Sequence, residues 1–246
     1  MKVYTLRTKH YILILWMTFT CYSQMNAQNS PVANYLKQVG DFADIYNGRI
    51  EPIYNPLTYE NLPYYLYSDF TEASVIFKNN YYPNQKVRLD LYKEQLIILP
   101  PEKKYGIVVS SQKVNKVFMY NKTFVLLDPP ESSGIKGGYY IQLIDGEKIK
   151  LFRKETYTLR QKQIIHNVGQ KQITSVFDNK TRYYLFYNNR YYTVKNKCSF
   201  TKLFSQHKKQ ISQYVKDRKF NFGQNAEASL TALVVYCEEL ITSTNK

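Results

Sequence analysis

The chain of 246 residues carries 34 Lys and Arg against 19 Asp and Glu, which gives a formal net charge of +15 at pH 7. A surface with this charge attracts anionic partners such as acidic lipids, acidic glycans or nucleic acid. The lysines are spread along the chain without a block of like charge, and no nucleic-acid-binding motif is present. We therefore exclude a nucleic-acid target and interpret the charge as a solvated basic surface.

The first 27 residues have the pattern of a signal peptide. Three basic residues precede an apolar stretch, Tyr11–Phe19, which is shorter than the roughly 20 apolar residues of a membrane-spanning helix. We expect export, with cleavage after Ser23 or Ala27; loss of residues 1–27 leaves 246 − 27 = 219 residues and a charge of +15 − 3 = +12. A retained membrane anchor and a lipoprotein modified at Cys21 are the alternatives.

Residues 28–246 are expected to form a single β-rich domain, with strands over about 45–197. A short helix comes first, because Val32, Leu36 and Val39 have helical spacing. In Lys86–Tyr92, apolar and polar residues then alternate as in a half-buried strand. The strands predicted in chain order are Ser74–Lys78, Lys86–Tyr92, Gln95–Leu99, Tyr105–Ser110, Val114–Tyr120, Thr123–Leu127, Tyr139–Ile144, Lys148–Leu159, Arg182–Tyr187 and Arg190–Lys195.

Two pairs of turn residues predict hairpins between consecutive strands. Asp145-Gly146 and Asn188-Asn189 each lie between two strand candidates, as two-residue hairpin turns do. The weakly patterned residues 160–172 are expected to form a loop. Antiparallel strands with short turns indicate a mainly β (α+β) fold, either an antiparallel β-sandwich or an open curled barrel.

Two amphipathic helices are predicted after residue 197. Apolar residues recur with helical spacing over about Thr201–Arg218 and again over about Asn225–Ile241. Such a pair must bury its apolar faces, and we expect it to pack on the sheet. Because the polar faces are rich in lysine, a position on a membrane surface is the alternative.

The chain lacks the common catalytic and metal-binding motifs. It has no HExxH, CxxC or GxSxG pattern, so we expect no metal, no cofactor and no catalytic residue that the sequence alone identifies. His166 falls in the expected loop, and His207 lies on the apolar face of the first predicted helix, where a packed side chain is the simpler interpretation. After cleavage only Cys198 and Cys237 remain, and sequence does not decide whether they pair.

Tyrosine is the unusual feature of the composition, with 25 Tyr against one Trp. Tyrosine doublets recur in the strand candidates, and neighbours in a strand point to opposite faces of a sheet. Each doublet would therefore place one ring in the core and one outside. Ordinary β-propensity explains the tyrosines equally well. The functional hypothesis is an exposed aromatic face that binds a ligand or partner, formed by Tyr65, Tyr82, Tyr92, Tyr140, Tyr184 and Tyr192.

Several segments occur in a characteristic order: Ala43-Asp44-Ile45-Tyr46-Asn47-Gly48-Arg49, Pro63-Tyr64-Tyr65, Val87-Arg88-Leu89-Asp90-Leu91-Tyr92, Gly138-Tyr139-Tyr140 and Tyr191-Tyr192-Thr193-Val194-Lys195. In these segments the chain resembles a group of exported β-rich proteins of the Bacteroidota that have no assigned activity. The resemblance implies a Gram-negative envelope, hence the periplasm or the periphery of the outer membrane. It carries no functional residue over to this chain.

The leading functional hypothesis is a non-catalytic envelope protein that binds another envelope protein. The first alternative is a carrier or binder of an anionic lipid or glycan in a concavity of the sheet. The second is a hydrolase whose site is assembled only by the fold.

Overall fold

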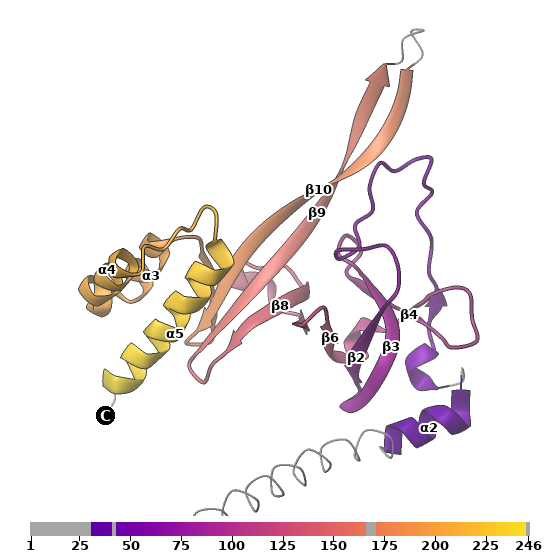
Figure 1. Ribbon diagram of the computed structural model, residues 1–246, viewed down its shortest axis with the longest axis horizontal. Helices are drawn as coiled ribbons and strands as arrows, with labels where there is room; N and C mark the ends of the chain where they lie inside the picture. The colour runs from indigo at the N-terminus through magenta and orange to yellow at the C-terminus, as the bar shows by residue number, and fades with distance from the viewer. Residues whose placement is uncertain (1–30, 41–42, 166–170, 245–246) are drawn as a thin grey trace, which may run out of the picture.

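A computed structural model describes residues 31–40, 43–165 and 171–244. Its strands form one antiparallel sheet of 11 strands in the order β1-β5-β4-β3-β2-β6-β7-β8-β9-β10-β11 (Figure 1). The bounds are β1 Arg49–Ile50, β2 Thr71–Phe77, β3 Asn80–Asp90, β4 Gln95–Leu99, β5 Ile107–Val108, β6 Val114–Met119, β7 Lys122–Leu127, β8 Gly138–Asp145, β9 Ile149–Ile165, β10 Lys171–Tyr187 and β11 Arg190–Val194.

The mainly β prediction is confirmed, but the sheet is single and open. A sandwich of two sheets is therefore wrong, and the two outer strands, β1 and β11, do not pair to close a barrel. The expected strand Tyr105–Ser110 shortens to β5, and Val114–Tyr120 ends one residue early because Tyr120 enters the turn to β7 with a positive φ of 49°.

The first half of the sheet encloses one apolar core. Side chains of β2, β3, β4, β6, β7 and β8 meet there with Ile45 from the short 3-10 helix η2, Asp44–Tyr46. The predicted N-terminal helix is confirmed as α2, Pro31–Val39, and its Val32, Leu36 and Val39 pack against this core. The expected signal peptide lies outside the described residues.

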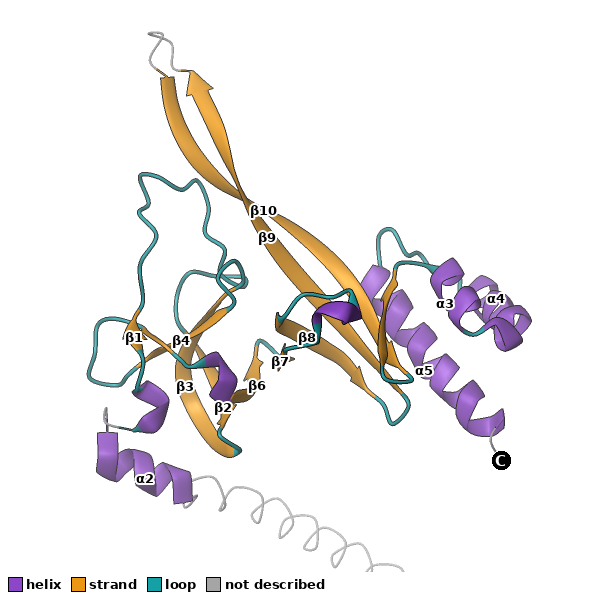
Figure 2. Ribbon diagram, turned by 180° about the vertical axis from the view of Figure 1, so that it is seen from behind, coloured by secondary structure: helices purple, strands orange, loops and turns teal. Residues whose placement is uncertain are grey.

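The C-terminal helices cover the other end of the sheet. They are α3 Lys197–Leu203, α4 Lys208–Asp217 and α5 Ala226–Thr244, and their apolar side chains share a second core with β9, β10 and β11 (Figure 2). The single helix expected over Thr201–Arg218 is wrong, because Phe204 leaves helical geometry (φ −110°, ψ 59°) and a 3-10 turn, Ser205–His207, follows. His207 is buried in this turn and its ring contacts Gln206 and Gln210, as expected of a packed side chain. None of the described helices is long and apolar enough to cross a membrane.

A hairpin is present at both predicted places, but only Asn188-Asn189 forms the expected two-residue turn; the expectation for Asp145-Gly146 is wrong, because Asp145 belongs to β8 and residues 146–149 separate it from its partner Lys150. Asn188 and Asn189 have φ values of 49° and 59° and join Tyr187 to its partner Arg190, as in a tight two-residue turn. At the other hairpin, Asp145 pairs with Lys150, and the Gly146 amide donates to the Ile149 carbonyl at 3.1 Å. The loop expected over residues 160–172 is wrong in most of its length, because β9 continues to Ile165 and β10 begins at Lys171. His166 lies outside the described residues.

Candidate interaction site

The longest hairpin of the sheet projects beyond its neighbours. Strands β9 and β10 pair over their whole length, from Ile149 opposite Tyr187 to Ile165 opposite Lys171. Strand β8 pairs with β9 only as far as Arg153, and β11 pairs with β10 only from Tyr183 onward. Residues 154–165 and 171–182 therefore form a two-stranded arm of about 40 Å, at ~3.3 Å per residue, which Figure 1 shows rising from the body.

A two-stranded ribbon is marginally stable by itself, and here a loop supports it. The loop of residues 51–70, between β1 and β2, runs alongside β10 (Figures 1 and 2). The Ser175 amide donates to the Thr58 carbonyl at 2.8 Å, and the Glu60 amide donates to the Ser175 carbonyl at 2.9 Å. The Asn61 side chain accepts from the Phe177 amide and donates to its carbonyl, both at 2.8 Å. The loop thus acts as a brace that extends the sheet along one edge of the arm.

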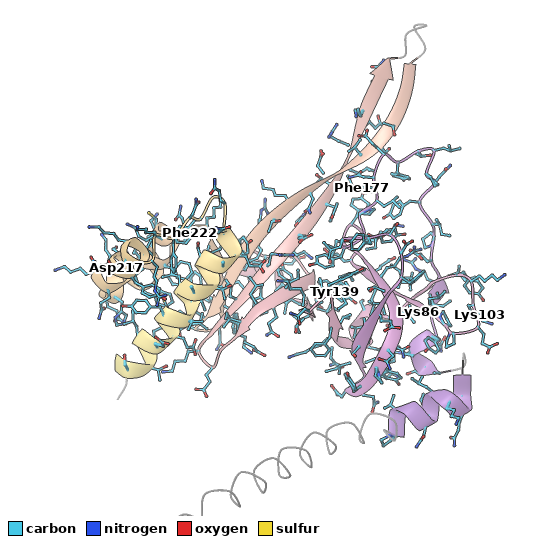
Figure 3. The ribbon with its side chains drawn as sticks, viewed as in Figure 1. Lys86, Lys103, Tyr139, Phe177, Asp217 and Phe222 are labelled. Carbon is cyan, nitrogen blue, oxygen red and sulfur yellow. The ribbon has the colours of Figure 1, made fainter. Side chains whose placement is uncertain are left out.

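Phe177 anchors the arm to the first half of the sheet. Its ring is buried in an aromatic cluster that includes Tyr54 and Tyr64 and packs on Ile97 of β4 (Figure 3). Phe177 stacks on Tyr59 of the brace, with ring centroids 5.4 Å apart, and meets Tyr54 edge-on at the same distance. Burial of an aromatic side chain in this way contributes several kcal/mol, so the arm is held in a defined direction.

The root of the arm is joined to the rest of the sheet by a buried ion pair. Lys154, which is 4% exposed, pairs with Glu94 of the turn between β3 and β4 and donates to the Tyr139 carbonyl at 3.0 Å. The second Glu94 oxygen accepts from the Tyr139 amide at 2.7 Å. Burial raises the pKa of Glu94 and lowers the pKa of Lys154, because it disfavours the charged form of each group. The attraction between the two charges acts in the opposite direction but is the smaller effect.

Arg153 joins the same root to the helical end. Its guanidinium donates to Glu227 of α5 at 2.5 Å, to Glu155 at 2.6 Å and to the Tyr65 hydroxyl at 3.2 Å. Successive residues of β9 point to opposite faces, so Arg153 and Lys154 connect the arm to elements on its two sides. The arm is therefore a rigidly seated projection.

The outward surfaces of the arm and brace are apolar at several positions. Leu57 is 84% exposed and Ile173 is 66% exposed, and they flank the hydrogen bond of 3.1 Å from the Thr174 hydroxyl to the Thr58 carbonyl. Ile53 of the brace and Leu159 of β9 are 74% and 40% exposed. In the described chain, residues 154–165 of β9 also have no strand beside their outer edge. An open edge with exposed apolar side chains is the arrangement that accepts an added strand.

The tyrosines expected to form an exposed face do not do so. Tyr65, Tyr82, Tyr140 and Tyr184 are buried, which contradicts the expected exposure, and Tyr192 is half-buried against the helical core. Only Tyr92, at 42% exposed, faces solvent, and its ring contacts Phe177 at 5.0 Å. Of this group, Tyr92 is thus the one that the structure exposes near the arm, while Tyr65 and Tyr140 contact Arg153 and Lys154 at its root from buried positions.

The buried carboxylates have structural partners. Glu51 accepts from the Arg88 guanidinium and from the Tyr64 hydroxyl at 2.8 Å, while Asp90 accepts from the Tyr54 hydroxyl at 2.8 Å. Burial raises the pKa of Asp90, which also accepts the backbone amides of Tyr92 and Lys93. Among residues 31–40, 43–165 and 171–244, no three His, Cys, Asp or Glu side chains gather as metal ligands.

Sequence reasoning predicted the inner part of the arm, as the strand Lys148–Leu159, but missed its outer part and the brace that supports it. The run Ile173–Phe177, with β-branched Ile173, Thr174 and Val176 beside Phe177, was a strand signal, but the polar residues before it dominated the interpretation. Nothing local indicated that the brace would pair with β10. A scan of protein-family models and searches of curated proteins and solved structures found no match to this chain.

Proposed function

We propose that this is a non-catalytic binding protein of the cell envelope, which uses its arm to bind another envelope protein. The observation that carries the proposal is the arm, which has an open β9 edge on one side and exposes Ile173 of β10 and Leu57 of the brace on the other. Large exposed apolar side chains gathered on a projection are typical of interaction surfaces.

The chemistry of the arm favours a partner that supplies an extended segment. The backbone of residues 154–165 offers hydrogen bonds along the open edge, and Leu159 of β9, which is 40% exposed, offers an apolar contact to an added strand. Charged residues of the arm are partly neutralised within the chain, since Arg160 pairs with Asp178 at 2.5 Å and Lys162 pairs with Glu60 at 2.8 Å. Backbone pairing and apolar contact would therefore contribute more than charge.

The test is a pull-down of the tagged protein from its native envelope in mild detergent, with retained proteins identified by mass spectrometry. The variant Leu57→Asp/Ile173→Asp places charge on the exposed apolar surface without changing the core. Val235→Asp is the matched control, because Val235 is 44% exposed on α5, outside the arm. We expect the wild type and the control to retain a stoichiometric protein that the double variant loses.

Two results would count against the proposal. One is retention of the same protein by the double variant, which would place the interface elsewhere. The other is a preparation that retains no protein but turns over a substrate, which would favour the hydrolase alternative.

A further inference from the structure

A polar hollow lies away from the arm, at the beginning of β2. Strand β6 pairs with β2 only up to Phe118, opposite Ser74, and then turns into β7. On the other side of β2, strand β3 contains a bulge: Val75 pairs with Tyr82, but Ala73 pairs with Gln85, so β3 has an extra residue between these two pairs. Asn84 lies in this bulge and has a φ of 54°. The bulge and the β6–β7 turn leave a hollow of about 400 Å³, within the range of about 300–1,000 Å³ for small-ligand sites.

The rim of this hollow carries polar side chains that bind nothing else in the described part of the protein. Glu72, Asn84 and Asn121 line it and are exposed, and no described residue gives their side chains a hydrogen bond or ion pair. Lys122 also lines the hollow, but its ammonium pairs with Glu227 at 2.8 Å. The free groups on the rim include one carboxylate and two amides, which together donate and accept hydrogen bonds.

Two aromatic rings stand beside these groups. Phe118 lines the hollow and is 36% exposed. Tyr81 is 51% exposed, and its hydroxyl donates to the Ser74 hydroxyl at 2.9 Å, directly across from Phe118. This hydrogen bond ties Tyr81 to Ser74, which lines the hollow, while Phe118 places an aromatic ring on the lining itself next to the polar rim.

We infer that this hollow binds a neutral sugar, with a pyranose ring packed on Phe118 and its hydroxyls bonded by Glu72, Asn84 and Asn121. The C–H face of a pyranose is apolar and packs on an aromatic ring, while carboxylate and amide groups match its hydroxyls. Lys122, the cation among the lining residues, already pairs with Glu227, so the free charge of the lining is the Glu72 carboxylate, which disfavours phosphate and acidic sugars. Lys86 lies opposite Glu72 in the β2–β3 ladder but does not line the hollow. The site is separate from the arm and does not depend on the proposed protein partner.

The chain offers variants that remove the ligand contacts without straining the backbone. Asn84 and Asn121 both have positive φ values, 54° and 55°, which glycine adopts without cost. Asn84→Gly/Asn121→Gly therefore removes both amides and keeps the turn and the bulge, and Phe118→Ala removes the ring. Tyr105→Ala is the matched control, since Tyr105 is 40% exposed in the loop before β5.

The test measures binding of maltotriose, cellotriose, chitotriose and xylotriose by saturation-transfer NMR, with galacturonic acid trimer as the acidic probe. We expect at least one neutral trisaccharide to bind, the acidic trimer to bind more weakly, and each of the two variants to bind at least about tenfold more weakly than wild type, ~1.4 kcal/mol. The Tyr105→Ala protein should bind as wild type does. Absence of binding by all four neutral probes, or binding unchanged in both variants, would overturn the inference, as would a preference for the acidic trimer.

Discussion

Buried Lys154 of β9 and partly exposed Glu94 of the β3–β4 turn form an ion pair, 60 positions apart in the chain. The two residues connect the root of the arm to the first half of the sheet. Removing one partner of a buried pair leaves the other charge without compensation, and this costs about 3–5 kcal/mol. We therefore expect Glu94→Gln to lower the free energy of unfolding strongly, as measured by urea denaturation.

The double variant Glu94→Gln/Lys154→Met serves as the control for this prediction. It removes both charges, while the new side-chain amide oxygen can still accept from the Tyr139 amide as Glu94 does. Its loss of stability should therefore be smaller than that of Glu94→Gln alone. A double variant whose loss equals the sum of the two single losses would show that the charges do not interact.

Phe177 is expected to decide whether the arm keeps its direction. Phe177→Ala empties its place in the cluster with Tyr54 and Tyr59 and should cost about 3–5 kcal/mol. Hydrogen exchange of the arm amides should become much faster, because the ribbon loses its main contact with the body.

Leu159 gives the matched control for the arm. It lies directly opposite Phe177 in the ribbon but is 40% exposed, so Leu159→Ala should change stability by only about 0.5 kcal/mol. Equal exchange rates in the two variants would contradict the role of Phe177 as an anchor.

The sequence predicts the strands of this fold better than their arrangement. Strand β4 is found at its predicted bounds, Gln95–Leu99, and Lys86–Tyr92 lies largely in β3, because each has a period or an apolar run of its own. The outer part of the arm was missed because Arg160–Gln163 borders no core, so its residues show little alternation. Its strand structure depends on pairing with β10. The brace also pairs with β10, and its residues lie more than a hundred positions before those of β10 in the sequence, so no local pattern predicts this contact.

The tyrosine face failed for a related reason. The prediction assumed that one face of each strand is exposed to solvent, but buried side chains lie on both faces of the second half of the sheet. Phe152 and Tyr184 belong to a cluster on one face, while Leu151 and Leu185 belong to the helical core on the other. The doublet Tyr139-Tyr140 is therefore buried at both positions, with each ring 1% exposed. Periodicity within one strand does not reveal what covers its second face.

Glu227 should make stability depend on pH in the acidic range. Burial alone would raise the pKa of this carboxyl, but hydrogen bonds from Lys122 and Arg153 outweigh it and hold the pKa below the ordinary 4.5. A depressed pKa contributes stability above pH 4.5 that is lost as the pH falls through the folded-state value. We expect Glu227→Gln to lower the free energy of unfolding by about 1.5–3 kcal/mol at neutral pH.

The difference between Glu227→Gln and wild type should shrink as the pH falls below 4.5, when urea unfolding is measured over a series of buffers. Glu239→Gln is the control, because Glu239 is exposed on the same helix and no described residue pairs with it. A difference that stays constant down to strongly acidic pH would show that the glutamate does not act through its charge.

Cys198 and Cys237 should behave as one accessible and one protected thiol. Cys198 is exposed at the beginning of α3, whereas Cys237 is 1% exposed in the helical core, and both are free. Burial raises the pKa of Cys237 to about 12, so little reactive thiolate forms near neutral pH. In the chain from residue 28 onward, a thiol reagent such as Ellman's should modify one cysteine quickly, and Cys198→Ser should abolish that phase. The second thiol should react only after unfolding in urea; a protein with no free thiol in urea would instead show that Cys198 and Cys237 pair.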